Sequence, residues 1–322
     1  MKIVFHGANA YTFREGLEAL LGRPHDIAEL PDDLSGGEAN AAYSAADVIV
    51  GNRLTAAMPV PHDLKLYQVP GAGYDGIDLA VLPEGAALCN CFGHENAIAE
   101  YVMAALLARH VPLADADRRL RAGDWKYWAG GPAGLRTELG GTSLGILGYG
   151  HIGKALALRA KAFGMQVCVA NRSPVQASSA VDRAFALTNL VEFMDSADAI
   201  VNTLPLTDDT RGLIGAAELA AMRPNAVILN VGRGAVIDEA ALYQALKAKR
   251  IGGAVIDTWY VYPSAENPTP PPSRLPFHEL DNIVLTPHMS GWTNGTIGRR
   301  RKAIAENINA LASGGNLKNR IR

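Results

Sequence analysis

The chain has 322 residues, a length that suits two domains of ordinary size. Its 30 Lys and Arg residues nearly balance 32 Asp and Glu, so the charge gives no reason to expect nucleic acid as a partner. Three cysteines are too few and too badly spaced for a disulfide framework or a four-ligand metal site. The first residues look like a strand rather than an export signal, and no apolar run reaches the roughly 18 residues of a membrane span. We therefore expect a cytoplasmic protein with no metal and no membrane partner.

Short apolar strands alternate with helical patterns along nearly the whole chain. This alternation predicts an α/β fold with doubly wound parallel sheets, each covered by helices on both faces. Helices are expected at 96–108, continuing into 112–121, and at 297–311, whereas the proline-dense stretch 263–276 predicts a constrained loop. The expected strands are 3–6, 48–51, 66–69, 87–91, 144–147, 166–170, 199–203, 226–231, 253–257 and 283–286.

A glycine-rich turn lies in the middle of the chain. Residues 143–154 read Ser-Leu-Gly-Ile-Leu-Gly-Tyr-Gly-His-Ile-Gly-Lys, an apolar strand followed by a G-x-G-x-x-G turn and a helix. Such glycines allow a tight turn and let backbone approach a pyrophosphate, while the helix N-terminus favours negative charge. The strand at 166–170 completes the βαβ unit that this motif needs. We predict a dinucleotide site that includes Gly148, Gly150, His151, Ile152 and Gly153.

The position of this turn predicts the domain organisation. A G-x-G-x-x-G turn belongs after the first strand of a dinucleotide-binding domain, yet at least four expected strands precede this one. We expect those strands to form a flavodoxin-like substrate domain, residues 1–98 and 291–322, interrupted by a Rossmann-like cofactor domain, residues 99–290. The basic run at 299–302 is expected to be a solvated face of the last helix, with a phosphate-binding patch as the alternative.

The end of the second strand of the unit indicates which dinucleotide binds. NAD sites usually place Asp or Glu there, where the carboxylate takes the ribose hydroxyls and repels a 2′-phosphate. This chain has Asn171, Arg172 and Ser173 instead. Asn cannot repel a phosphate, and a guanidinium can bind one in a bidentate fork. We therefore predict a preference for NADP(H) over NAD(H); the alternative is an exposed turn arginine and an NAD site made by backbone.

Three further strand ends carry side chains that can do chemistry. Arg233, Asp257 and His288 each follow an expected strand, so they should converge on one edge of the sheet. A guanidinium can hold a carboxylate and polarise an adjacent carbonyl, and imidazole titrates near working pH and can donate the proton. Taken singly, a surface arginine, a helix-capping aspartate and a buried histidine explain them as well.

These motifs together resemble the D-isomer-specific 2-hydroxyacid dehydrogenase family, and the resemblance covers essentially the whole chain. It implies hydride transfer between NAD(P)H and a small 2-oxo acid, of the glyoxylate/hydroxypyruvate reductase type, and from the resemblance alone a homodimer. The matching stretches are VPGAGYDGID at 69–78, NAIAEY at 96–101, ELGGTSLGILG at 138–148, NTLPLTDDT at 202–210, NVGRG at 230–234 and TPH at 286–288.

The resemblance also implies roles for individual residues. Arg233 would bind substrate, His288 would be the acid/base, and the backbone of Ala72 and Gly73 would hold the carboxylate. Asp257 would orient the nicotinamide amide. The further cofactor contacts expected are Leu204, Pro205, Thr210, Val231, Gly232 and Gly291.

One departure from the family concerns the partner of the catalytic histidine. Most members have a Glu before a proline at the position of Tyr262, and a phenol brings no charge at neutral pH, so the pKa of His288 should fall. Three alternatives remain for the missing partner of His288: Glu266 takes its place, Ser290 forms a hydrogen bond near the ring, or the histidine works unpaired. The neutral residue also keeps open formate-dehydrogenase-like oxidation and a nucleotide-sensing, corepressor-like role with little turnover.

Substrate identity is the least determined part. Asn52 and Arg53 can add a second cation for a phosphorylated or dicarboxylate substrate, or lie idle on the surface. His94 is a candidate for the substrate pocket, with a surface or capping role as the alternative. An aromatic rim to the pocket is suggested, against simple packing, by Trp125, Tyr127, Trp128, Trp259, Tyr262 and Trp292.

Overall fold

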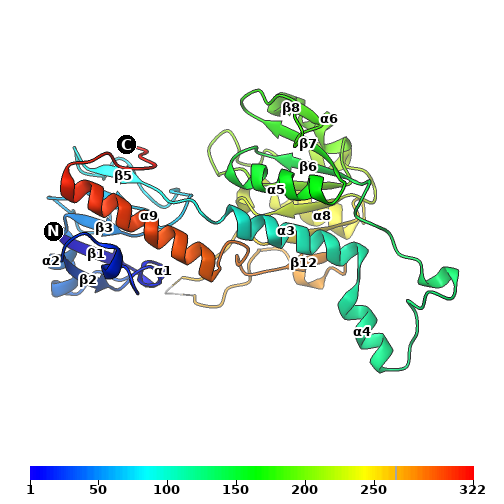
Figure 1. Cartoon of the computed structure of the whole chain (residues 1–322), viewed down its shortest axis with the longest axis horizontal. Coiled ribbons are helices and arrows are strands. Elements are labelled where there is room, and N and C mark those ends of the chain that lie inside the picture. The colour runs from blue at the N-terminus through cyan, green and yellow to red at the C-terminus, as the bar shows by residue number, and fades with distance from the viewer. Residues whose placement is uncertain (265–266) are drawn as a thin grey trace. The chain divides into compact units, whose positions relative to one another are not determined.

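A computed structural model describes residues 1–264 and 267–322. The chain divides into two compact units, Met1–Gly93 with Trp292–Arg322 and His94–Gly291, which we call unit 1 and unit 2 (Figure 1). The first boundary between the two units follows residue 93, whereas the sequence predicts it after residue 98. The reason is that α3 (Glu95–His110) packs on α5 (His151–Ala162) within unit 2. Two doubly wound α/β units, one split in sequence by the other, confirm the predicted fold class.

Unit 2 is built on a parallel sheet of seven strands in the order β12-β11-β10-β9-β6-β7-β8. The chain runs outward from β6 in one direction and then returns to β9 and runs outward in the other, so the switch point lies between β6 and β9. The strands are β6 (Ser143–Leu147), β7 (Gln166–Asn171), β8 (Arg183–Ala186), β9 (Ala199–Asn202), β10 (Val227–Asn230), β11 (Gly253–Ile256) and β12 (Ile283–Leu285).

Helices cover both faces of this sheet, and each face has its own apolar core. One core lies between the sheet and α3 and α5. The other lies between the sheet and α6 (Leu190–Asp195), α7 (Ala216–Ala221) and α8 (Glu239–Lys247). The remaining elements are α4 (Leu113–Arg121) and the short 3-10 turns Pro132–Gly134, Leu187–Asn189, Gly234–Val236 and Phe277–Glu279.

Unit 1 has a five-stranded parallel sheet in the order β2-β1-β3-β4-β5. Helix α9 closes one face against the strands, so the C-terminal segment completes the core that the first residues begin. The elements are β1 (Lys2–His6), α1 (Ala8–Tyr11), a 3-10 turn (Glu18–Leu20), β2 (Asp26–Leu30), α2 (Gly37–Ser44), β3 (Val48–Val50), β4 (Leu66–Gln68), β5 (Ala87–Cys89) and α9 (Asn294–Ser313).

Two features differ from the sequence-based expectations. Strands β2 and β8 are absent from the predicted set; both lie at sheet edges, where β2 exposes Asp26 and Glu29 and β8 has one large apolar residue, Phe185. The basic run is not simply a solvated face, since Arg299 Nε donates to the carbonyl of Gly93 at 2.7 Å and Arg301 to that of Thr12 at 3.5 Å. In the part of the chain described here, no single helix has the length and apolar character to cross a membrane, although α3 and α4, bent by 47°, pass that test together.

Candidate active site

The glycine turn follows β6 at the switch point of the unit 2 sheet. Gly148 has a φ of +95°, and a Cβ there would lie 2.9 Å from the Thr203 hydroxyl, so only glycine fits. A Cβ on Gly153 would lie 2.3 Å from the carbonyl oxygen of Gly148. Gly148 therefore allows the turn to approach the segment after β9, and Gly153 allows α5 to pack closely against the turn.

Gly150 differs from the other two, because no protein atom lies within 4 Å of the place a Cβ would take. It is also the residue at which α5 begins, with His151 and Ile152 in the first turn and no side chain capping the helix. Open space beside uncapped N–H groups fits the pyrophosphate of a dinucleotide. When bound, a nicotinamide dinucleotide supplies or accepts a hydride.

In the segment that ends β7, Asn171 is hydrogen-bonded within the protein, whereas Arg172 and Ser173 are exposed. The Asn171 amide oxygen accepts the N–H of Tyr149 at 3.1 Å, and its NH₂ donates to the Ser173 carbonyl at 3.0 Å. Asn171 therefore ties its own loop to the glycine turn. Arg172 and Ser173 are exposed, and Arg172 forms no ion pair with any residue that the structure describes. The guanidinium is thus available at the strand end where a ribose would lie.

Two buried asparagines hold the turns after β9 and β10. Asn202 donates its amide NH₂ to the Asn230 side-chain oxygen at 2.9 Å and accepts the N–H of Leu204 at 3.1 Å. Gly232 fits tightly here, because a Cβ would lie 2.5 Å from the Leu204 carbonyl oxygen. Val231 is buried beside it, Pro205 is exposed, and the Thr210 hydroxyl donates to the Pro205 carbonyl at 2.7 Å. The predicted cofactor contacts thus share two braced turns.

Arg233 lies three residues after the end of β10. Its side chain is half-buried, its backbone carbonyl accepts from Asn230 Nδ2 at 3.1 Å, and one guanidinium nitrogen donates to the Gly232 carbonyl at 3.0 Å. At Gly234 a Cβ would lie 2.3 Å from the Trp259 carbonyl oxygen. The turn that carries Arg233 is therefore packed directly on the segment that follows β11.

His288 lies in a turn after β12 with a left-handed backbone, φ +59°. Such a conformation costs a non-glycine residue about 1 kcal/mol or more. The carboxylate of Asp257, fully buried at the end of β11, accepts the Thr286 hydroxyl at 2.6 Å and the N–H groups of Met289 and Ser290 at 2.9 Å each. These contacts stabilise the turn on both sides of His288.

Tyr262 reaches the imidazole of His288. Its hydroxyl lies 2.9 Å from His288 Nδ1, and the N–H of Trp259 donates to the same hydroxyl at 3.0 Å. Trp259 also donates its indole N–H to the Thr286 carbonyl at 2.7 Å. Trp259 therefore links the turns after β10, β11 and β12, and through them Arg233, Tyr262 and His288.

Other predicted residues have local roles. His94 is buried at the start of α3, and its Cβ lies 3.4 Å from the place a Cβ on Gly291 would take. Ser290 is buried, with its N–H on Asp257. Glu266, one of the alternatives expected from the sequence for the partner of His288, lies outside the described residues.

Within unit 1, Asn52 and Arg53 are exposed just after β3. Ala72 and Gly73 are half-buried in a turn whose Ala72 carbonyl accepts the Asn90 amide at 2.8 Å.

Comparison with known proteins identifies the family. The family model for the NAD binding domain of D-isomer specific 2-hydroxyacid dehydrogenases matches residues 103–290. The chain belongs to this family.

Relatives over nearly the whole length are enzymes. The chain is 29% identical to a glycerate dehydrogenase of Methylorubrum extorquens over 94% of this chain and 95% of that protein. Among solved structures, it resembles an acyclic imino acid reductase in complex with NADPH and D-Arg, with TM-score 0.79, 26% identity and all of both chains covered. It also resembles the NADPH-dependent glyoxylate/hydroxypyruvate reductase of Sinorhizobium meliloti in complex with NADP and malonate, with TM-score 0.78, 25% identity and coverage of 99% and 96%.

This 2-hydroxyacid dehydrogenase is therefore an oxidoreductase that uses a nicotinamide cofactor and a small hydroxy or oxo acid. The comparisons do not favour formate-type oxidation or a corepressor-like role. The sequence does not predict the supporting contacts of Tyr101, Trp259 and Thr286 in the dehydrogenase site. Tyr101 and Thr286 stand in motifs that match the family, and Trp259 is expected only in an aromatic rim.

The aromatic residues expected to form a rim belong to both units of the chain. Trp259 is a core residue at 7% exposure, and Trp292 belongs to unit 1, where it packs edge-to-face on Phe13 at 6.0 Å. Trp125 and Trp128 are exposed on the segment after α4.

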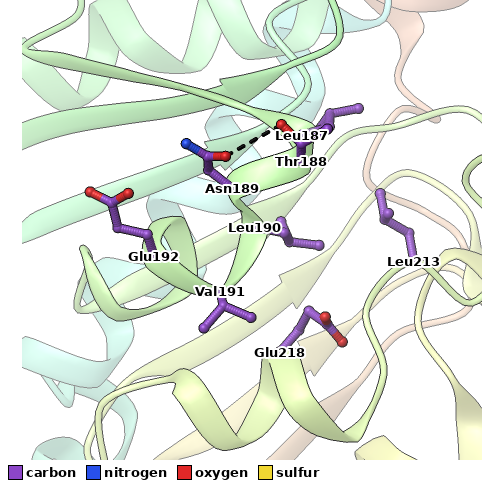
Figure 2. A pocket seen from close by; sticks show the side chains of 8 residues that line it. All are labelled: Leu187, Thr188, Asn189, Leu190, Val191, Glu192, Leu213 and Glu218. Atoms are coloured by element: carbon purple, nitrogen blue, oxygen red, sulfur yellow. Dashed lines mark hydrogen bonds between the residues drawn. The ribbon is translucent and has the colours of Figure 1, made fainter.

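A surface hollow of about 580 Å³ lies in unit 2 between the segment 187–192 and α7 (Figure 2). None of the predicted site residues lines it, and its charged lining residues are carboxylates, Glu192 and Glu218. Glu218 is already used to accept the N–H of Gly215 at the start of α7. No cationic side chain of the described residues lines this hollow, so its charges do not favour an anionic substrate of the dehydrogenase.

Proposed function

We propose that this protein is an NADPH-preferring reductase of small 2-oxo acids such as glyoxylate or hydroxypyruvate. The preference for NADPH rests mainly on Arg172, which is exposed beside the glycine turn without an ion pair among the described residues. Asn171, which stands where an NAD site has a carboxylate, is engaged with Tyr149 and adds no negative charge. A 2′-phosphate would thus meet a cation and no repelling group.

The proposed chemistry assigns one task to each side chain. Arg233 holds the substrate carboxylate in a bidentate pair and polarises the neighbouring carbonyl. As hydride reaches the carbonyl carbon, His288 gives a proton to the carbonyl oxygen and is reprotonated from solvent, so that a 2-hydroxy acid forms. Backbone N–H groups of Ala72 and Gly73 and the side chains of Asn52, Arg53, His94 and Ser290 are proposed as substrate contacts.

Steady-state kinetics with both cofactors test this proposal. We expect turnover of glyoxylate or hydroxypyruvate with a kcat/KM for NADPH at least tenfold above that for NADH. Arg172→Ala should lower kcat/KM for NADPH by about tenfold, the equivalent of about 1.4 kcal/mol, and leave that for NADH nearly unchanged. Exposed Arg211, outside the predicted site, provides the matched control Arg211→Ala. No NADPH oxidation with any 2-oxo acid of a panel would refute the proposed activity.

A second candidate substrate class is favoured by the contact between Tyr262 and His288. A 2-iminium acid arrives already protonated, so hydride addition to its C=N carbon gives the amine without a proton from the enzyme. A histidine whose Nδ1 contacts a neutral phenol suits such a substrate better than a carbonyl at high pH. The similar acyclic imino acid reductase shows that this fold carries such chemistry. NADPH oxidation with pyruvate and excess methylamine, compared with pyruvate alone at pH 9, separates the two substrate classes.

We also propose a homodimer formed through an arm of unit 2, residues 111–138. Figure 1 shows α4 and the segment after it projecting from the rest of this unit. The charged groups of α4 are largely paired among themselves: hydrogen bonds from Arg119 and Tyr127 lower the pKa of Asp115 to about 2. The apolar side chains are open, with Leu113 at 74%, Trp128 at 63% and Leu135 at 82% exposure. Exposed apolar side chains of this kind suit a contact with a second copy of the chain.

A further inference from the structure

We propose that Asp257 is a positioning residue for His288, whose carboxylate holds the residues on both sides of the histidine and so presents the imidazole to Tyr262. This inference rests on the proposed acid/base role of His288. It differs from the role that family resemblance implies for Asp257, which is to orient the nicotinamide amide.

The local sequence makes the turn dependent on an outside acceptor. Thr286 precedes a proline and is therefore restricted to extended backbone, which continues β12 and pairs its N–H with the Ile256 carbonyl at 3.0 Å. His288 then turns through the left-handed region, φ +59°. This reversal points the N–H groups of Met289 and Ser290 back at the end of β11, where Asp257 accepts both.

The hydrogen-bond directions in this cluster are fixed by chemistry. Asp257 accepts from two N–H groups that can only donate, and its Oδ1 also lies 2.6 Å from the Thr286 hydroxyl. As a carboxylate it must accept from that hydroxyl as well, so Thr286 in turn accepts from the Tyr101 hydroxyl at 2.7 Å. Burial, followed by the charge of Asp257, raises the pKa of Tyr101, so this phenol stays protonated and able to donate.

The carboxylate is largely used by this network. An ionised carboxylate has about four acceptor positions, and three of those of Asp257 are filled from the segment 286–290. Two contacts reach Oδ1 and one reaches Oδ2, so a single acceptor position on Oδ2 is left for any other donor. Most of what Asp257 does is therefore directed at the turn of His288.

The consequence for the site is the orientation of one ring. Tyr262 is held from the segment after β11, because its hydroxyl accepts the backbone N–H of Trp259 at 3.0 Å. Its 2.9 Å contact with His288 Nδ1 then requires that the backbone of residue 288 stay where Asp257 holds it. If that hold is lost, the imidazole leaves Tyr262 and samples other positions, while the glycine turn and α5 are unaffected.

The test compares variants of the full-length protein with and without substrate. Asp257→Asn keeps the shape but turns an amide NH₂ toward a backbone N–H, and Thr286→Val removes one donor without changing volume. We expect kcat for 2-oxo acid reduction to fall by 10-fold or more in both, with the dissociation constant for NADPH within threefold of wild type. Thr286→Ser, which restores the hydroxyl, should recover most of the rate. Asp238→Asn, the same substitution at the start of α8, is the stability control.

A readout without turnover separates this proposal from the proposed function. Nitrogen NMR of histidine-labelled protein, assigned with His288→Ala, reports the hydrogen bond at His288 Nδ1 whether or not any 2-oxo acid is reduced. The Nδ1 signal should move toward that of a solvent-exposed histidine in Asp257→Asn and in Thr286→Val. An unchanged His288 signal in both variants, or a rise in the NADPH dissociation constant as large as the fall in kcat, would overturn the proposal.

Discussion

At the scale of single residues, the site combines side chains that the sequence identifies with contacts that it does not reveal. Arg233 and His288 stand in motifs whose spacing and family resemblance are enough to mark them as site residues. The contact from Asn171 to Tyr149 and the three donors on Asp257 join residues 22 to 33 positions apart. No local pattern encodes such pairings, because they depend on which strands become neighbours and on the left-handed turn at His288.

The nature of the group at position 262 should determine the pH range of reduction. In Tyr262→Glu the phenol that contacts His288 Nδ1 is replaced by a carboxylate, which favours the imidazolium and raises the histidine pKa. Because reduction of a carbonyl needs the protonated form, the high-pH limb of kcat/KM should move to higher pH by the same amount. Profiles from pH 5 to 10 measure this shift.

Two further variants serve as controls for that profile. Tyr262→Phe removes the hydroxyl without adding charge and should not move the limb upward. Glu266→Gln tests whether Glu266 supports the histidine: a downward shift of the limb would show that it does. A limb that stays in place in Tyr262→Glu would mean that the group at position 262 does not set the proton affinity of the acid.

A different histidine should make the stability of unit 1 depend on pH. Burial lowers the pKa of His6, which is 2% exposed and packs edge-to-face on Tyr43. The unfolded chain has an ordinary histidine pKa near 6.5. Just below that pH the unfolded state therefore binds a proton at residue 6, whereas the folded state does not. Stability should be constant above about pH 6.5 and fall below it, by at most about 1.4 kcal/mol per pH unit for this group.

Urea unfolding between pH 5 and 8 measures this dependence. His6→Phe keeps an aromatic ring against Tyr43 and removes the titration, so its free energy of unfolding should fall less steeply below pH 6.5. Burial also lowers the pKa values of His25 and His110, so part of the slope will remain. An identical slope in the variant would show that His6 takes up its proton equally well in the folded state.

At the scale of elements, burial decides what could be predicted. Central strands such as β6 and β10 are buried along their whole length and read as apolar runs, so the sequence predicts them closely. Strands β2 and β8 pair along one side only, and neither holds a run of large apolar residues, because Asp26 and Glu29 interrupt β2 and β8 reads Arg-Ala-Phe-Ala. The sequence predicts α3 and α9 to within three residues at each end, because each has a long apolar face toward a core.

The three glycines of the turn should separate into packing and binding roles. Gly153→Ala puts a Cβ 2.3 Å from the Gly148 carbonyl oxygen, so it should destabilise unit 2 by about 1–3 kcal/mol. Gly150→Ala meets no protein atom within 4 Å, so the fold should tolerate it, while the methyl group occupies space proposed for the pyrophosphate. Its NADPH dissociation constant should rise about tenfold with little change in melting temperature.

Thermal melts and NADPH fluorescence titrations on the same two proteins measure both effects. Gly298→Ala, at an open position in α9 of unit 1, supplies the matched glycine control for both measurements. If Gly150→Ala bound NADPH as tightly as wild type, the phosphates would have to lie elsewhere than at the start of α5.

At the scale of the whole molecule, the mid-chain position of the glycine turn is the observation that predicts a split substrate unit. Both units are doubly wound parallel sheets, and each has a switch point, between β6 and β9 in unit 2 and between β1 and β3 in unit 1. Asn52 and Arg53 follow β3 at the second of these positions, where ligands of such sheets bind. The oligomeric state, unlike the domain organisation, is not predicted by the sequence, because neither composition nor periodicity indicates which exposed apolar residues contact a partner.

The arm at 111–138 should carry the proposed homodimer. We expect wild-type protein to show a mass near twice 34.1 kDa in size-exclusion chromatography with light scattering. Trp128→Asp and Leu135→Asp place a charge among exposed apolar side chains and should weaken association by about 2 kcal/mol, roughly 30-fold in dissociation constant. Leu158→Asp, at an exposed leucine on α5, should leave the mass unchanged. A wild-type mass of 34.1 kDa at micromolar concentration would contradict the proposal, and equal dissociation in all three variants would place the contact elsewhere than the arm.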